Sequence, residues 1–135
     1  MYAARKGFLP TIECLVEKGA ELEATNSDGN TALHLTSRKG WLTSVKYLLQ
    51  KGANLEAKND AGDTALHLAS KEGHSSTLQF LVEKGGKVNE VNNDDITPLH
   101  LAACSGQLSA VQLLLDHGAE QNKRDEVGLV HFFLR

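Results

Sequence analysis

The chain has 135 residues, of which 41% are hydrophobic and 23% are charged, and its formal net charge is −3. This composition is typical of a folded globular domain, and it argues against a disordered chain and a highly basic nucleic-acid-binding protein. The two cysteines are too few for a disulfide framework. The N-terminus lacks the apolar segment of a signal peptide, and no apolar run approaches the ~20 residues of a membrane span. We therefore expect an intracellular protein, located in the cytoplasm, with a nuclear location left open.

Residues 1–25 contain the first predicted helical unit, which is incomplete. The sequence starts inside a short helix without an N-cap residue, and a second helix follows it. In this second helix Ile12, Leu15 and Val16 stand at i, i+3 and i+4, so they form one apolar stripe. We expect Cys14, at a position where later units carry larger apolar side chains, to be a small packing residue.

Residues 26–58 form the first complete unit. It opens with the turn-forming residues 26–30, Asn-Ser-Asp-Gly-Asn. Thr31 then has the chemistry of an N-cap for a short first helix that ends at Gly40. A second helix over residues 42–51 carries an apolar stripe, and because so short a helix is marginal alone, its stripe must pack against the neighbouring unit.

The same unit returns over residues 59–91 and again over residues 92–124. The motif Thr-Ala-Leu-His-Leu that begins at Thr31 begins again at Thr64, and at Thr97 with proline in place of alanine, so the period is 33 residues. Several glycine and leucine series keep the same period. An internal repeat of this length predicts a solenoid.

The turn of the third unit differs from the two before it. Gly29 and Gly62 can adopt a positive φ at little steric cost, whereas the third turn has Asp95 at the same position. We therefore expect the third turn to be the strained one. Residues 125–135 begin another copy without the motif, which we interpret as a segment of a longer array, with a natural C-terminal cap as the alternative.

The motif Thr-Pro-Leu-His-Leu-Ala-Ala from Thr97 and the 33-residue period resemble the ankyrin repeat family. The resemblance implies an all-α ankyrin-repeat solenoid over residues 1–135, in which pairs of short antiparallel helices alternate with β-turn or hairpin finger loops. It also implies a non-catalytic scaffold that binds a protein partner on the concave face made by the fingers and first helices. The alternative is a structural spacer, or a fragment of a longer ankyrin-repeat protein, with no dedicated partner on these repeats.

The residues that this resemblance assigns to the concave face differ in sign, with acidic fingers and mostly basic helix ends. The candidate partner-binding residues are Asp28, Asn30, Asp60, Asp63, Asp94 and Ile96 in the fingers, Arg38, Lys39, Lys71, Glu72 and Cys104 at the helix ends, and Trp41 beside them. Two stripes of opposite charge favour a partner with separated charges. The alternative interpretation is a solvated surface whose charges follow turn and helix-cap propensity.

Trp41 stands at the start of a second helix and has two interpretations. It is either an aromatic anchor for a partner, since tryptophan is enriched among interface hot spots, or a residue that packs over the neighbouring turn. Cys104 is expected at the surface, as an accessible thiol or as a plain structural residue. Asn89 follows Val88 and lies eight residues after Leu81. The family resemblance makes it a possible hydroxylation site, and a loop-ordering role is the alternative.

The repeated histidines His34, His67 and His100 invite a metal or catalytic interpretation. Packed helices lie roughly 8–10 Å apart, whereas zinc holds each ligand nitrogen within about 2.1 Å, so equivalent histidines cannot share an ion. We expect each imidazole to bond its own N-cap threonine and a nearby backbone group. We expect neither a cofactor nor a metal, no nucleic-acid, membrane or small-molecule ligand, and a monomer.

Overall fold

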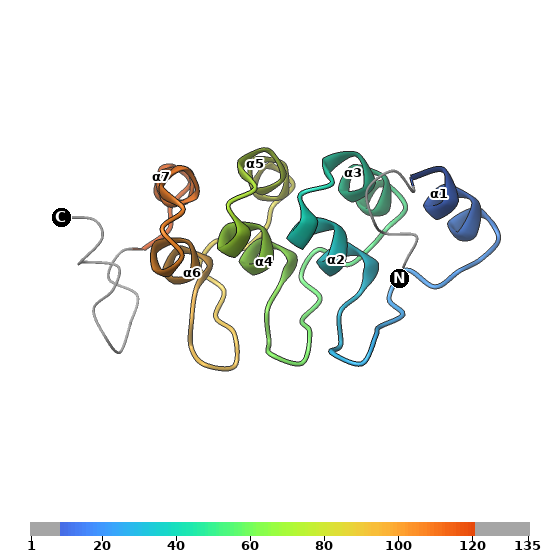
Figure 1. Cartoon of the computed structure of the whole chain (residues 1–135), viewed down its shortest axis with the longest axis horizontal. Helices are drawn as coiled ribbons and strands as arrows, with labels where there is room; N and C mark the ends of the chain where they lie inside the picture. Colours follow the sequence, from blue (N-terminus) through green and yellow to red (C-terminus); the bar gives the residue numbers. More distant parts are fainter. Residues whose placement is uncertain (1–8, 121–135) are drawn as a thin grey trace.

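The computed structural model describes residues 9–120, and these residues form seven α-helices and no strand. The helices are α1 (Leu9–Glu17), α2 (Ala32–Lys39), α3 (Leu42–Gln50), α4 (Ala65–Glu72), α5 (Ser75–Glu83), α6 (Pro98–Cys104) and α7 (Leu108–Asp116). Figure 1 shows them in two rows along the long axis, with first helices α2, α4 and α6 in one row and second helices α1, α3, α5 and α7 in the other. The loops extend from the first-helix row. The predicted all-α solenoid of paired helices is confirmed.

Each first helix begins at the predicted threonine cap. The hydroxyl oxygen of Thr31 accepts from the backbone N–H of His34 at 3.3 Å, and the ring Nδ1 of His34 accepts from the backbone N–H of Thr31 at 3.0 Å. The same reciprocal pair forms at Thr64 and Thr97. Two backbone N–H groups at each helix start are thereby satisfied.

The helix ends depart slightly from the prediction. Gly40 and Gly73 follow α2 and α4 directly in the left-handed conformation, with φ of 75° and 74°. The helix α6 ends two residues before Gly106, because Ser105 takes the cap position. The second helix predicted over residues 42–51 ends at Gln50.

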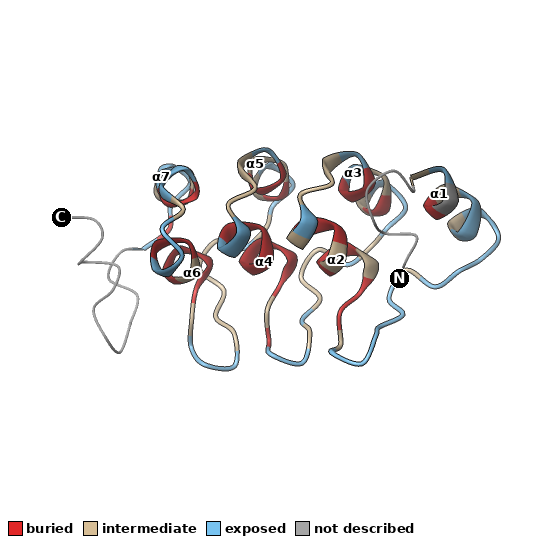
Figure 2. Ribbon diagram, viewed as in Figure 1, coloured by how far each residue is buried: buried red, intermediate tan, exposed pale blue. Residues whose placement is uncertain are grey.

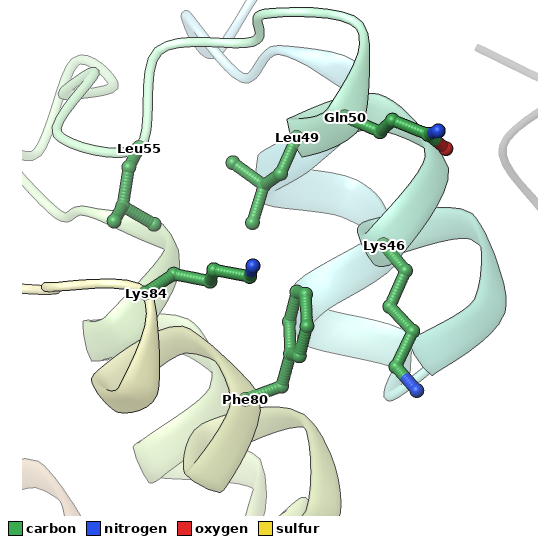
Figure 3. A pocket seen from close by; sticks show the side chains of 6 residues that line it. All are labelled: Lys46, Leu49, Gln50, Leu55, Phe80 and Lys84. Carbon is green, nitrogen blue, oxygen red and sulfur yellow. The ribbon is translucent and has the colours of Figure 1, made fainter.

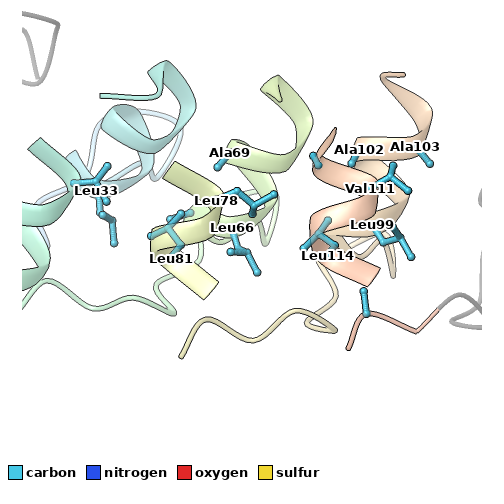
Figure 4. Packing of buried hydrophobic residues seen from close by; sticks show 14 residues of the cluster. Leu33, Leu66, Ala69, Leu78, Leu81, Leu99, Ala102, Ala103, Val111 and Leu114 are labelled. Carbon is cyan, nitrogen blue, oxygen red and sulfur yellow. The ribbon is translucent and has the colours of Figure 1, made fainter. Parts of the chain in front are cut away.

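The core lies between successive helix pairs. Leu48, Leu78, Leu81 and Leu114 of the second helices are almost fully buried, and so is Leu66 of α4. Figure 2 shows burial concentrated in the first helices and on the sides of the second helices that face them, and Figure 4 shows the core side chains between neighbouring pairs. Each unit therefore completes the core of its neighbour, as a solenoid requires.

Two predictions for the first unit are wrong. Leu15, the equivalent of the buried Leu48, keeps 47% of its surface exposed, because no first helix among the described residues packs beside α1. Cys14 is exposed rather than packed. Its equivalents Tyr47 and Phe80 are half-buried against the preceding second helix, and within the described residues α1 has no such helix before it.

Candidate functional site

Each finger is a tight turn held by one asparagine side chain. The Oδ1 of Asn59 accepts from the backbone N–H groups of Ala61 and Asp63, both at 3.0 Å, and the backbone N–H of Asn59 donates to the carbonyl of Asp63 at 3.1 Å. Asn26 and Asn92 make the equivalent bonds in the other two fingers. This is the asparagine turn chemistry that fixes a loop without a strand. These asparagines were not among the predicted functional residues, although their 33-residue period is visible in the sequence.

Neighbouring fingers are also bonded to one another. The backbone N–H of Asp60 donates to the carbonyl of Asp28 at 3.1 Å, and that of Asn93 donates to the carbonyl of Ala61 at 3.0 Å. The amide of Asn93 adds a bond to the carbonyl of Asp60 at 2.8 Å. The fingers therefore form a continuous edge whose side chains are presented at fixed spacing.

A hollow of about 360 Å³ lies between the first two fingers and the ends of α2 and α4. It brings together seven predicted partner-binding residues, namely Asp28, Asn30, Asp60 and Asp63 from the fingers and Arg38, Lys71 and Glu72 from the helices. The finger side carries carboxylates, and Arg38 and Lys71 place positive charge on the helix side. The hollow thus has the separated charges that the sequence predicted.

The prediction of Asn30 as a partner-binding residue needs correction. Only 3% of its surface is exposed, and its Oδ1 accepts from the Asn59 amide at 2.8 Å. Asn30 therefore links two fingers and offers no side-chain surface to a partner. Asp63, at the equivalent position in the next finger, is half-buried and accepts from the Asn92 amide at 2.9 Å, so one of its oxygens is already used.

The other predicted residues lie outside the hollow. Lys39, Asp94 and Cys104 are exposed, which for Cys104 agrees with the predicted surface position, and Ile96 is half-buried. None of these four lines the hollow.

Trp41 is half-buried at the residue before α3. A Cβ added to Gly40 would lie 2.5 Å from the ring of His74, and one added to Gly73 would contact Gln107. His74 and Gln107 are the residues equivalent to Trp41 in the next two units, so this position packs against a glycine of the preceding unit. The packing interpretation of Trp41 gains support from this geometry. The glycine that would face Trp41 itself lies outside the described residues.

Asn89 orders a loop. Its Oδ1 accepts from the backbone N–H of Glu120 at 2.9 Å, and its amide donates to the carbonyl of Gly118 at 3.2 Å. One unit earlier, Glu56 accepts from the backbone N–H of Lys87 at 3.2 Å, so the position serves the same purpose in both units. The loop-ordering role is confirmed, and hydroxylation of Asn89 stays a hypothesis.

The repeated histidines have the predicted structural role. The Nδ1 of each accepts from its cap, and in His34 and His67 the Nε2 therefore carries the ring proton and donates to backbone carbonyls at or beside the following finger. The Nε2 of His34 lies 3.0 Å from the carbonyls of Ala57 and Asp63, and that of His67 lies 2.9 Å from the carbonyl of Ile96. Burial lowers the pKa of His34 and His67 below the ordinary 6.5, although the carbonyls oppose this shift.

Within residues 9–120, no three His, Cys, Asp or Glu side chains come together in a group that could hold a metal ion. No helix in that part of the chain combines the length and the apolar character needed to cross a membrane.

The comparisons with known proteins agree with this architecture. A family model described as "Ankyrin repeats (3 copies)" matches residues 1–92 and 53–125 of the chain. Together the two matched ranges contain all seven helices of the described residues. The comparison with curated proteins finds no match.

Proposed function

The chain belongs to the ankyrin repeat family, and from this premise we propose that it is a non-catalytic scaffold whose protein partner binds the fingers and the ends of the first helices. Ankyrin repeats are generally protein-interaction modules, and the family is typically non-catalytic. The hollow between the first two fingers and the ends of α2 and α4 is the observation that carries the proposal.

The charges of the hollow indicate what a partner must offer. Asp28 and Asp60 are exposed on the finger side, and Arg38 and Lys71 lie on the helix side of the same hollow. A partner segment that places basic groups over the fingers and acidic groups over the helix ends would satisfy both sets. Complementarity of this kind contributes more to specificity and association rate than to affinity, so charge reversal is the sharpest probe.

The rigidity of the fingers supports the same proposal. The asparagine turns and the bonds between neighbouring fingers hold Asp28 and Asp60 before any partner arrives. A surface that is already ordered loses little conformational entropy on binding. A spacer would need ordered helices and a packed core, but it would not need opposite charges placed across one hollow.

Affinity capture with the whole chain distinguishes the scaffold from the spacer. The variants Arg38→Glu and Asp60→Lys should each lose captured proteins by roughly tenfold or more, because like charges then face each other across the interface. Lys51→Glu is the control, since it makes the same charge change as Arg38→Glu at an exposed residue outside the hollow. A set of captured proteins that is the same for wild type and both variants would contradict binding at the fingers and the first-helix ends.

A further inference from the structure

A second hollow lies on the opposite row of helices, between α3 and α5. Its volume is about 510 Å³, and its lining consists of Lys46, Leu49, Gln50, Leu55, Phe80 and Lys84. Leu49 and Leu55 are half-buried and form an apolar wall, and Phe80 stands opposite them (Figure 3). We call this hollow the α3–α5 groove. None of its residues lines the hollow beside the fingers, so the two surfaces are distinct.

Two positive charges are held at the aromatic ring of the groove. The ammonium nitrogens of Lys46 and Lys84 each lie 5.5 Å from the centroid of the Phe80 ring. Figure 3 shows the ring between the two lysine side chains, with the ammonium of Lys84 close to Leu49. At this distance a cation is attracted to the face of the ring, so the ring holds both charges at the groove.

The groove supplies no negative charge of its own. None of the six lining residues is acidic. Within residues 9–120 the ion pair is that of Lys58 with Glu90, and neither groove lysine takes part in one. An apolar wall bordered by two unpaired ammonium groups is complementary to an apolar side chain flanked by carboxylates.

The repeat provides an internal comparison, because the same positions recur one unit earlier. There the equivalents of Lys46 and Gln50 are Glu13 and Glu17, so carboxylates stand beside the ring of Tyr47. Partial burial, and then the negative charges of Glu17 and Glu13, raise the pKa of Tyr47. The equivalent positions one unit earlier therefore carry two carboxylates and a single ammonium group, that of Lys51.

The positions one unit later also differ from the α3–α5 groove. Lys46 and Lys84 are replaced by Gln79 and His117, and Phe80 is replaced by Leu113. The arrangement of two lysines around an aromatic ring is thus not a consequence of the repeat pattern. It is particular to the groove between α3 and α5 among the three groove positions of the described residues.

We propose that the α3–α5 groove binds an acidic peptide segment of a partner protein. A bulky apolar side chain of the segment packs against Phe80 and Leu49, and flanking Asp or Glu carboxylates pair with Lys46 and Lys84. A peptide fits better than a nucleic acid, because the wall opposite Phe80 is aliphatic and the net charge of the chain is −3. The proposal is independent of the partner surface at the fingers.

Selection of a random peptide display library on the whole folded chain tests the proposal. The selected peptides should carry at least two acidic residues around a Leu, Ile, Phe or Trp. Their affinity should fall roughly three- to tenfold in the double variant Lys46→Gln/Lys84→Gln, because each exposed charge pair contributes modestly. Phe80→Leu should also weaken binding while preserving the fold, since the next unit has leucine at this position.

Lys51→Gln is the matched control. Lys51 is the equivalent of Lys84 one unit earlier, and its ammonium lies 5.6 Å from the centroid of the Tyr47 ring, but it does not line the groove. Peptide affinity should be unchanged in Lys51→Gln and in Arg38→Glu. Recovery of no peptide, peptides without acidic enrichment, equal affinity for the double variant, or lysine-dependent binding of anionic lipid vesicles without an acidic peptide would each overturn the proposal.

Discussion

In the first two Thr-x-x-His motifs, the histidine ties the start of one helix to the finger of the next unit. His67 is fully buried, accepts a backbone N–H at Nδ1 and donates from Nε2 to the carbonyl of Ile96, which lies one unit further on. A leucine of similar size could fill the same space, but it would leave the backbone N–H of Thr64 without its partner and would remove one of the two bonds to the carbonyl of Ile96, which also accepts from the backbone N–H of Asn92. The residue is therefore retained by hydrogen bonding, and no catalytic role is needed to explain its recurrence.

We expect His67→Leu to lower the free energy of unfolding by roughly 1–3 kcal/mol at neutral pH, since it leaves the buried backbone N–H of Thr64 without a partner and removes the bond to the carbonyl of Ile96. The midpoint of denaturant unfolding measures this loss. His117→Leu is the control, because His117 is exposed and should tolerate the change. An unchanged midpoint in His67→Leu would contradict the structural role.

The same variant should also change how stability depends on pH. The unfolded chain protonates His67 near its ordinary pKa of 6.5, whereas the folded chain protonates it at a lower pH. Between these two pH values the unfolded state binds more protons, so the free energy of unfolding falls as the pH falls below 6.5. The loss should be smaller in His67→Leu. Glu90, whose carboxylate lies near His67, contributes little in this window, because its hydrogen bond with Lys58 holds its pKa below the ordinary 4.5.

At the scale of elements, the helices and their caps could be predicted because they depend on local chemistry that recurs every unit. The threonine caps, the glycines after α2 and α4 and the apolar stripes are all local patterns. The burial of Asn30 and the exposure of Cys14 could not be predicted in this way. Each depends on which elements pack beside that particular copy of the repeat. The repeat pattern assigns the same environment to the equivalent position of every copy, so it does not predict such differences in burial.

The charged hollow was only partly predictable for the same reason. The signs of the finger and helix-end residues are evident in the sequence, and the structure brings seven of the twelve predicted residues to one hollow. Lys39 and Cys104 are also at the ends of predicted first helices, yet they do not line the hollow. Which side of a short helix faces the fingers depends on how the pairs stack, and this is a property of several units together.

The third finger carries the strain that its sequence predicts. Asp95 has a φ of 62°, and among residues 9–120 it is the one non-glycine residue with a positive φ. The equivalent residues of the first two fingers are glycines, Gly29 and Gly62. We expect Asp95→Gly to raise the free energy of unfolding by about 0.5–1 kcal/mol, since glycine adopts this conformation without steric cost. Thermal or denaturant unfolding measures the change.

Asp94→Gly is the control for that substitution. Asp94 is also exposed, but its φ is not positive, so glycine there only adds freedom to the unfolded chain and should lower stability slightly. Equal effects of the two substitutions, or a loss of stability in Asp95→Gly, would show that the third finger is not strained.

At the scale of the whole molecule, the modest net charge of −3 is distributed over surfaces of different character. The finger row carries opposite charges across one hollow, and the α3–α5 groove on the opposite row carries two lysines and no acid. Because no residue lines both hollows, a substitution in the lining of one leaves the lining residues of the other unchanged. The two surfaces can therefore be tested separately.

The central claim, that a protein partner binds the fingers and first-helix ends, is tested most directly by hydrogen–deuterium exchange. The chain is compared free and in complex with a captured partner that is sensitive to Arg38→Glu. Exchange should slow in residues 26–30 and 59–63 and at the C-terminal ends of α2 and α4. Slowed exchange confined to the second-helix row, with the fingers unchanged, would contradict the claim.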